Sequence, residues 1–315
     1  MNSFPRKLIT EWRRLTLAVE GGTMIVACSG GADSCSLLLA VKELTDRKKL
    51  GHNIIAAHFD HGLRNESSDD AEFVRELCNT NGIEFVLGRE HVSQRGNLEE
   101  NARNARYSFL ARTAQKHNAF AVLTGHTIND QAETFLLNLI RGSGSDGLSA
   151  MPPVRPLAKC DADLVRPLVR IATREETVEY CAGHGVEFRR DPMNEDPSFT
   201  RVRIRREVIP LLSELNPRIV ATLARTAEHF AAVPLIEPLP EKLRSSDLVK
   251  VSEKERLALI RAWMIERRGS SRRLTFAHIN AVDKLLTSTK SGRVVELPGG
   301  AVVERSGGWL SYRTE

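Results

Sequence analysis

Residues 24–47 read MIVACSGGADSCSLLLAVKELTDR, which is a short apolar run, a turn containing glycine and then a helical pattern of apolar residues. The turn itself is Ser29-Gly30-Gly31-Ala32-Asp33-Ser34. Its glycines allow positive φ and close approach of the backbone, and the following helix presents its first N–H groups. This stretch therefore predicts a strand, an anion-binding loop and a helix, in that order.

The loop differs from the two commonest phosphate-binding loops. A Walker A loop ends in Gly-Lys-Ser/Thr, and this loop has no lysine. Its glycines are adjacent, which breaks the Gly-x-Gly-x-x-Gly spacing of dinucleotide-binding folds. Because the Asp33 carboxylate would repel bare pyrophosphate, we expect a nucleotide complexed with Mg²⁺. The alternative is a plain glycine turn in which Asp33 caps the helix.

Strands and helices alternate through the first half of the chain. The predicted strands are residues 24–28, 54–59, 84–87 and 120–123, and the helices that follow them are 34–47, 68–79, 98–116 and 130–141. A further strand is expected at 164–169 and a helix at 173–184. This alternation predicts an α/β fold with a doubly wound parallel sheet, in which ligands bind at the carboxyl ends of the strands.

The length of 315 residues predicts about two domains. Pro192, Pro197 and Pro210 interrupt the pattern, and Asn216-Pro217 opens a new helical one. We place the boundary near residue 212, which gives a domain at 1–212 and a smaller, mainly helical domain at 213–315. Helices are expected at 218–232, 254–267 and 276–287, and a hairpin at 294–303.

Charge is distributed unevenly along the chain. Residues 201–315 carry 21 Lys and Arg against 13 Asp and Glu, a net of +8, whereas residues 1–200 carry a net of −3. This asymmetry favours an anionic partner for the last third, above all nucleic acid. Basic helix faces that contact only solvent are the alternative.

Composition limits the location of the protein. Hydrophobic residues make up 41% and charged residues 27%, which is typical of a folded chain, and the longest apolar run, near Leu37–Val41, is too short to span a bilayer. The N-terminus has no apolar secretion segment. Five cysteines form neither a disulfide framework nor a Cys-x-x-Cys pair, so we expect a cytoplasmic protein without membrane contact.

Further motifs follow the predicted strands. They are His58–Arg64, Asn97–Tyr107, Gly125–Thr134, Arg166-Pro167-Leu168 and residues 191–205. With the Ser29–Ser34 loop they resemble the PP-loop, or N-type ATP pyrophosphatase, superfamily of adenine nucleotide alpha-hydrolase-like folds. As a set they resemble the tRNA(Ile)-lysidine synthetase family in its short form, over about the first two-thirds of the chain.

The resemblance implies an ATP-dependent ligase that forms a C–N bond. It would join free L-lysine to C2 of the wobble cytidine of isoleucine tRNA with a CAU anticodon, through an adenylated cytidine, giving lysidine, AMP and pyrophosphate. ATP and Mg²⁺ are the implied cofactors. The oligomeric state stays open, with a homodimer as one option.

The resemblance and the loop chemistry together give candidate site residues. The ATP-binding set is Ser29, Gly30, Gly31, Ala32, Asp33, Ser34, Asp60 and His126. The catalytic set is Asp33, Arg106, Asp130 and Glu133, in which Asp33 and Asp130 are the metal ligands and Asp130 or Glu133 accepts a proton from lysine. The candidate tRNA contacts are Arg201, Arg203, Arg205 and Arg206.

Several of these residues have structural alternatives. Arg106 has no acidic partner on its own helix, so it is a phosphate clamp or forms a salt bridge elsewhere. Asp130 and Glu133 lie in a first helical turn, where the macrodipole favours acids in any case. Asn129 stands where the family usually has an acidic residue, and Val202 where it usually has asparagine.

Two other functions remain open. A PP-loop ligase that adenylates a small molecule would explain the loop but not the basic last third. A non-catalytic RNA-binding protein would explain the charge but leave the loop without a role. Sulfur transfer is disfavoured, because related tRNA thiolases depend on Cys-x-x-Cys pairs.

Overall fold

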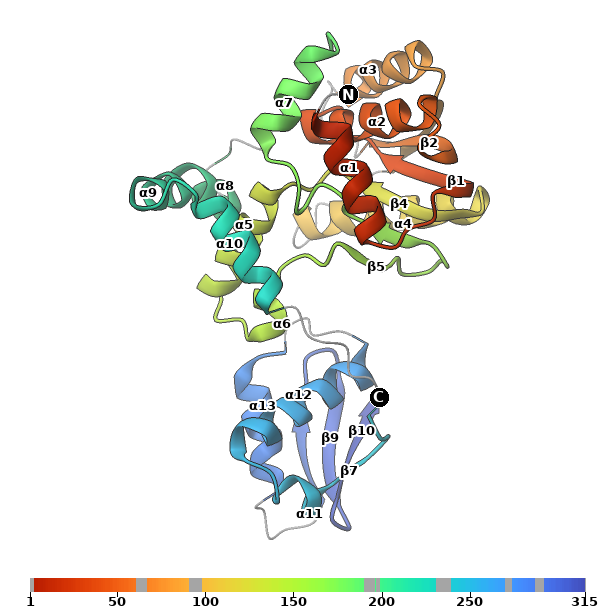
Figure 1. The fold of residues 1–315 in the computed structure, drawn as a ribbon. Coiled ribbons are helices and arrows are strands. Elements are labelled where there is room, and N and C mark those ends of the chain that lie inside the picture. The colour runs from red at the N-terminus through yellow and green to blue at the C-terminus, as the bar shows by residue number, and fades with distance from the viewer. Residues whose placement is uncertain are drawn as a thin grey trace. The chain divides into compact units, whose positions relative to one another are not determined.

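The computed structural model describes residues 3–60, 67–90, 98–189, 196, 199–230, 239–269, 274–286 and 292–314. The chain divides into two compact units, one formed by residues 1–137 and 150–228 and the other by 138–149 and 229–315 (Figure 1). Residue 212, near which we place the domain boundary, lies in helix α9 (Ile209–Leu215). None of the described helices is both long enough and apolar enough to cross a bilayer.

The first unit is built on a six-stranded sheet in the order β3-β2-β1-β4-β6-β5. Its strands are β1 (Glu20–Ala27), β2 (Gly51–Asp60), β3 (Glu84–Arg89), β4 (Ala119–Thr124), β5 (Val154–Pro156) and β6 (Asp163–Val165). All pairings are parallel except that between β5 and β6. The chain winds outward in both directions from the β1–β4 pair, so the predicted doubly wound class is confirmed. The antiparallel edge strand β5 is an addition.

Helices cover both faces of this sheet (Figure 1). Side chains of α1 (Ser3–Arg14), α2 (Ala32–Asp46), α3 (Ser67–Thr80) and α7 (Arg174–Gly183) share one buried cluster. Side chains of α4 (Leu98–Lys116) belong to a second cluster. Met24 and Val26 of β1 point into the first cluster and Ile25 into the second, as the alternation of a strand requires.

The point of divergence between β1 and β4 determines where a ligand binds. In a doubly wound sheet the connections after these two strands leave on opposite sides, and a crevice opens at their carboxyl ends. The Ser29–Ser34 loop follows β1, and His126 follows β4 just before helix α5 (Ile128–Ile140). The fold therefore brings the predicted loop and the predicted acidic helix to the same edge of the sheet.

A nearly continuous helical stretch covers residues 200–215. It consists of α8 (Thr200–Arg203), a π-helical turn (Ile204–Val208) and α9. The prediction that Pro210 interrupts this region is wrong, because the helical stretch continues through Pro210. Proline cannot donate to the carbonyl four residues earlier, and the wider π turn, in which the N–H of Ile209 bonds to Ile204 O, accommodates that loss. Helix α10 (Ile219–His229) follows.

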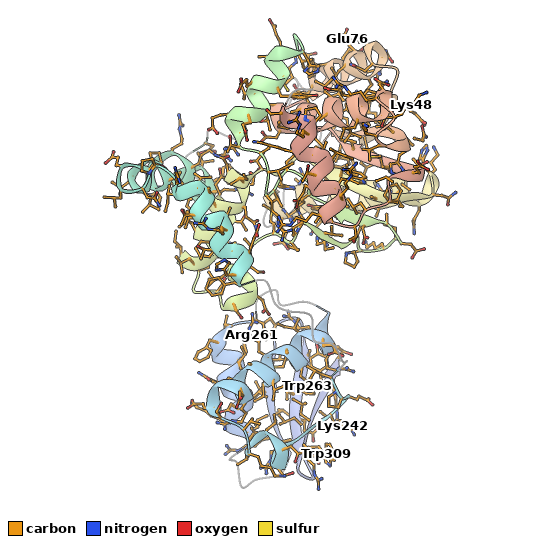
Figure 2. The ribbon with its side chains drawn as sticks, viewed as in Figure 1. Lys48, Glu76, Lys242, Arg261, Trp263 and Trp309 are labelled. Atoms are coloured by element: carbon orange, nitrogen blue, oxygen red, sulfur yellow. The ribbon has the colours of Figure 1, made fainter. Side chains whose placement is uncertain are left out.

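The second unit combines helices with a four-stranded antiparallel sheet in the order β7-β10-β9-β8. Its elements are α6 (Ser145–Leu148), β7 (Leu243–Arg244), α11 (Ser245–Leu248), α12 (Glu253–Arg268), α13 (Phe276–Leu286), β8 (Arg293–Glu296), β9 (Ala301–Ser306) and β10 (Trp309–Thr314). The expected hairpin is confirmed as β8–β9. Trp263 is fully buried in this core, whereas Trp309 is exposed (Figure 2).

Candidate active site

The loop after β1 presents unpaired backbone donors. Gly31 is the N-cap of α2 and provides no side-chain cap, so the N–H groups of Ala32 and Asp33 have no intrahelical acceptor. Gly30 has φ +90°, a conformation that glycine adopts without strain. The predicted anion-binding geometry is present at this helix N-terminus.

The two serines of the loop differ in their surroundings. Ser34 is buried; its hydroxyl donates to Gly31 O at 3.0 Å and accepts from the backbone N–H of Ser29 at 3.1 Å. Ser29 is exposed. Ser34 therefore shapes the loop from within, and Ser29 is the hydroxyl that a ligand can reach.

Gly125 connects the end of β4 to this loop. A Cβ atom at Gly125 would lie 2.6 Å from Asp33 O, so no larger residue fits there without moving the loop. The next residue, His126, has its Nδ1 2.8 Å from Thr124 Oγ1. Burial, together with the positive charge of Arg166 and Arg106, lowers the pKa of His126 to about 3 although Asp130 opposes this, so its imidazole is neutral at physiological pH.

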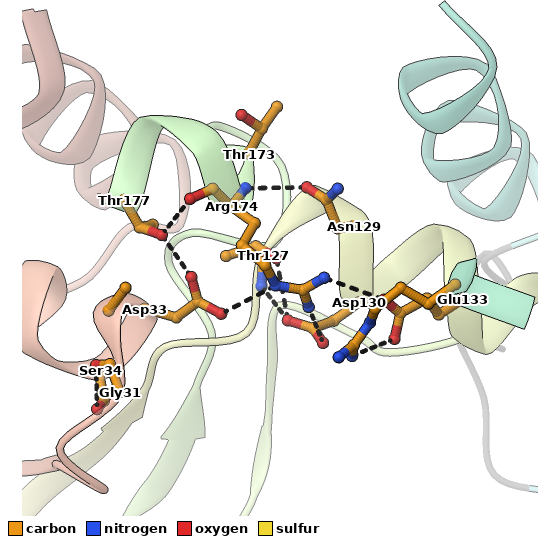
Figure 3. A network of polar contacts seen from close by, with 12 residues as sticks. Gly31, Asp33, Ser34, Thr127, Asn129, Asp130, Glu133, Thr173, Arg174 and Thr177 are labelled. Carbon is orange, nitrogen blue, oxygen red and sulfur yellow. Dashed lines mark hydrogen bonds and ion pairs between the residues drawn. The ribbon is translucent and has the colours of Figure 1, made fainter. Parts of the chain in front are cut away.

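Arg174, the first residue of α7, connects three carboxylates (Figure 3). Its guanidinium lies 3.7 Å from Asp33 Oδ2 and 3.3 Å from both Asp130 Oδ1 and Glu133 Oε1. Asp33 also accepts a hydrogen bond from the Thr177 hydroxyl. The loop carboxylate and the two carboxylates of α5 therefore belong to one site, which we call the carboxylate cluster (Asp33, Asp130, Glu133).

Two further arginines complete the neutralisation of this cluster. Arg205 donates to both Glu133 oxygens, at 2.7 and 3.0 Å. Arg201 donates to Glu133 Oε2 at 2.8 Å and to Asp130 Oδ1 at 3.0 Å. Three carboxylates thus face three guanidiniums, and the Glu133 side chain is fully buried among them.

The surroundings give the carboxylates different pKa values. Burial raises the pKa of Asp130, but Arg201, His126 and Arg174 outweigh burial and bring it down to about 2. The pKa of Glu133 is lowered in the same way, by Arg205 and Arg201 against burial. For Asp33 burial dominates and raises the pKa to about 6, in spite of the Thr177 hydrogen bond. Asp33 is therefore the carboxylate that titrates nearest to neutral pH.

The two predicted metal ligands differ in the oxygen atoms they offer. Both oxygens of Asp130 are engaged, Oδ1 by arginines and Oδ2 by the N–H and hydroxyl of Thr127 at 2.8 and 3.0 Å. Asp33 Oδ2 has only the ion pair with Arg174 at 3.7 Å within the described residues. Among the described residues, no three or more His, Cys, Asp or Glu side chains are arranged so that they could hold a metal ion together. Since Mg²⁺ commonly takes one or two carboxylates together with substrate phosphates, Asp33 fits this metal.

Asn129 has a structural role here. Its Oδ1 accepts a hydrogen bond from the backbone N–H of Arg174 at 2.9 Å (Figure 3). This bond attaches the start of α5 to the start of α7 and so helps to place the Arg174 side chain. An aspartate could accept the same bond, which explains how either residue can occupy this position.

The remaining predicted residues lie around this centre. Arg106 is half-buried and forms no ion pair with any described residue. Asp60, at the carboxyl end of β2, is buried and lies 3.3 Å from Arg89 Nε. Arg203 is exposed and pairs with Glu207 at 3.0 Å, and Arg206 is exposed as well. Residues 61–64, 97, 191–195, 197 and 198 of the quoted motifs lie outside the described ranges.

Sequence reasoning missed Arg174 and Thr177. Arg174 is followed by Glu175 and Glu176, which suggest partners on its own helix, and no motif marked it. A usable indication is its position: it opens the helix after a predicted strand, and so lies at the carboxyl edge where ligands bind.

Two family models match separate parts of the chain. A PP-loop domain matches residues 6–212, and a TilS substrate binding domain matches residues 243–311. The first match contains the loop, the carboxylate cluster and all three of its arginines. The second lies wholly in the second unit.

Full-length relatives agree with these matches. The chain is 38% identical to tRNA(Ile)-lysidine synthase of Salinispora arenicola over 95% of this chain and 93% of the relative, and 34% identical to that of a Nostoc species over 92% and 91%. In fold it is similar to the U34-tRNA thiolase NcsA from Methanococcus maripaludis, with a TM-score of 0.61, 18% identity and coverage of 72% of this chain and 77% of that one. The chain belongs to the tRNA(Ile)-lysidine synthase family of ATP-using ligases.

Proposed function

We propose that this chain joins L-lysine to C2 of the wobble cytidine of isoleucine tRNA with a CAU anticodon, consuming ATP and releasing AMP and pyrophosphate. One observation carries the chemistry: Arg174 connects the loop carboxylate Asp33 to Asp130 and Glu133. The phosphate-binding loop and a second charged subsite are therefore adjacent, as a two-step adenylation and ligation requires.

The first step activates the base. The C2 carbonyl of cytidine is ureide-like, and its oxygen is a poor leaving group, so an amine cannot displace it directly. Attack of that oxygen on the α-phosphorus forms a P–O bond to the base and breaks the bond to the β-phosphate. Pyrophosphate leaves, and the adenylated oxygen becomes a good leaving group.

The loop and Arg106 supply donors for this step. The N–H groups of Ala32 and Asp33 are free to donate to the β- and γ-phosphates, and the helix dipole of α2 favours negative charge there. Arg106 has no anionic partner among the described residues and can donate to the α-phosphate as charge develops. Asp33 would hold Mg²⁺, which when bound neutralises phosphate charge and favours departure of pyrophosphate.

The second step needs a neutral ε-amine of lysine. The amine forms a bond to C2, the C2–O bond breaks, and AMP leaves with the oxygen. One proton from the ammonium must reach a base, for which Asp130 or Glu133 is our candidate. Because arginines hold their pKa values low, either carboxylate becomes an effective base only when one of its arginines moves away.

RNA recognition would involve both units. The exposed Arg203 and Arg206 lie on the helical stretch at 200–215, and the second unit is the part of the chain that matches a substrate-binding domain. Arg201 and Arg205 instead neutralise the carboxylate cluster. Five free thiols fit a reducing compartment, so we place the reaction in the cytoplasm.

A single assay distinguishes the candidate functions. Radiolabelled ATP is incubated with the protein, lysine and individual purified tRNAs, and pyrophosphate release is measured. Release only with isoleucine tRNA bearing CAU supports the proposal. Release without tRNA would instead indicate a ligase acting on a small molecule, and no release with any tRNA would indicate a non-catalytic RNA-binding protein.

A further inference from the structure

Tyr107 on α4 lies at the centre of a group of arginines. The guanidinium carbons nearest to its ring belong to Arg103 at 5.1 Å, Arg106 at 5.5 Å and Arg155 at 5.5 Å. Arg166, which is only 2% exposed, also lies close enough for its positive charge to lower the pKa of Tyr107. Burial would raise the pKa of Tyr107, but these arginines outweigh burial and lower it. The environment of Tyr107 is therefore strongly positive.

No carboxylate balances this charge in the part of the chain that the structure describes. Arg155 and Arg166 donate to backbone carbonyls, at 3.2 and 2.8 Å, and none of the four arginines forms an ion pair there. Within the same ranges, Nε of Arg166 is buried without a hydrogen-bond partner. Like charges at this spacing repel one another, so a bound anion would stabilise the arrangement.

Tyr107, Arg103 and Arg155 also line an open cavity of about 380 Å³. Its wall includes Arg103, Asn104, Tyr107, Ser108, Arg155 and Lys159, and we call it the basic pocket. The volume is in the range of small-ligand sites and accommodates a phosphate with part of its nucleoside. The guanidiniums of Arg103 and Arg155 match the geometry of phosphate oxygens. The amide of Asn104 and the hydroxyl of Ser108 add neutral hydrogen-bond donors.

The basic pocket lies near the active site, because Tyr107 in its wall adjoins Arg106. Arg106 and Arg166 do not line the cavity, but they lie close enough to His126 for their charge to lower its pKa. Lys159 is exposed in the turn between β5 and β6. In the proposed function the loop after β1 binds the β- and γ-phosphates of ATP and Arg106 the α-phosphate. Arg103, Arg155 and Lys159 of the basic pocket are therefore available for another phosphate.

We infer that the basic pocket binds a backbone phosphate of the RNA substrate, at a nucleotide beside the one that reacts. This inference rests on the proposed function, since it assigns one contact of the tRNA. A phosphate held here would direct the RNA strand toward His126 and Arg106. Arg155 and Lys159 are the positioning residues that can be changed without altering the proposed catalytic set.

The test uses the full chain with Arg155→Ala and Lys159→Ala combined. Affinity for isoleucine tRNA is measured at several salt concentrations, and ATP affinity is measured separately. We expect tRNA affinity to fall about tenfold near 0.15 M salt, and the slope of log K against log[salt] to flatten by about 0.7–0.9, because one phosphate is no longer neutralised by the protein. ATP affinity should not change.

Arg112→Ala is the control, because Arg112 is an exposed arginine on α4, the helix that carries Arg103 and Tyr107, and it pairs with Glu90 at 3.4 Å outside the basic pocket. It should leave the salt slope unchanged. If the double variant unfolds, Lys159→Ala alone replaces it, because Lys159 is exposed and its loss keeps the fold. This single variant should still weaken tRNA binding and flatten the salt slope in part. A double variant that matches the control would overturn the inference. So would weaker ATP binding with an unchanged tRNA slope, which would place a phosphate of ATP in the pocket.

The outcomes separate this inference from the proposed function. If the wild type binds tRNA but releases no pyrophosphate with it, the proposed function fails while the salt slopes still decide the role of the pocket. If tRNA binding by the wild type does not depend on salt, the inference that the basic pocket binds an RNA phosphate is wrong.

Discussion

Arg205 holds both oxygens of the Glu133 carboxylate, through Nε at 2.7 Å and Nη2 at 3.0 Å. Glu133 is inaccessible to solvent, so this bidentate pair acts at low local dielectric and is an internal counterion pair. Arg205, which the sequence predicts as an RNA contact, thus neutralises a buried carboxylate of the candidate site.

Glu133→Gln should destabilise the protein strongly. The amide keeps the shape of the side chain but leaves three guanidiniums with one fewer anion, and breaking a buried pair in this way costs about 3–5 kcal/mol. Thermal and urea unfolding measure the loss. Glu207→Gln is the control, because it removes the partner of the exposed Arg203 and should not shift the melting midpoint. Equal midpoints for the two variants would contradict the buried counterion role.

Asn129→Asp should retain function, whereas Asn129→Ala should not. The carboxylate can still accept from the Arg174 N–H, and a negative charge is favourable at the N-terminus of α7. Alanine removes the acceptor, and we expect a loss of about 1 kcal/mol in stability and slower adenylation. Single-turnover adenylation and thermal melting are the measurements. If alanine and aspartate behave alike, this hydrogen bond does not position Arg174.

Asp33→Asn should lower turnover by at least about 100-fold without lowering stability at pH 8. The raised pKa of Asp33, about 6 against an ordinary 3.8, means that the native state binds this proton more tightly than the unfolded state. Its contribution to stability is therefore fully present below pH 3.8 and is lost as pH rises through about 6. The amide introduced by this change does not titrate, so the variant does not lose this stability as pH rises. The melting midpoint of Asp33→Asn minus that of the wild type should therefore increase between about pH 4 and 7. Activity within about threefold of wild type would exclude a metal or catalytic role for Asp33.

Arg106→Ala should slow adenylation by about 100-fold, because a donor aimed at the developing phosphate charge is lost. No described anionic partner is left unpaired by the change, so thermal stability should stay near that of the wild type. Single-turnover formation of the adenylated tRNA separates this step from lysine transfer. An unchanged adenylation rate would return Arg106 to a purely structural role.

Arg203→Ala and Arg201→Ala should affect different properties. Arg203 is exposed, so its loss should flatten the salt dependence of tRNA binding by roughly one unit if it contacts a phosphate, and leave stability unchanged. Arg201 holds Asp130 and Glu133, so its loss should lower the melting midpoint. Parallel salt plots for Arg203→Ala and the wild type would exclude Arg203 from the RNA interface.

The sequence predicts the first unit well, because its determinants are local. The loop after β1, the strand and helix alternation and the acids on α5 can all be inferred from short stretches, and each element is present. The edge strand β5, only three residues long and ending in Pro156, and the strands β7 and β10 depend on partners elsewhere in the chain. Periodicity alone gives no indication of them.

The candidate site shows the same limit. Arg201, Arg203, Arg205 and Arg206 form one basic run in the sequence, yet two of them face Glu133 and two are exposed. Which arginine meets which carboxylate depends on how the 200–215 helical stretch lies against α5, and this is a tertiary relationship. Counting charges in the sequence identifies the basic run, but it does not show which of its arginines are partly buried against Glu133 and which are exposed.

The separation of Glu133 from its arginines in sequence affects the newly made chain. Arg174, Arg201 and Arg205 follow Glu133 by 41, 68 and 72 residues. At about 5–20 residues per second, the ribosome delivers Arg205 roughly 4–14 s after Glu133. During that interval α5 carries a carboxylate that cannot be buried without cost, so it would remain in water or take up a proton. The active-site end of α5 would therefore pack late, after the chain has grown past residue 205.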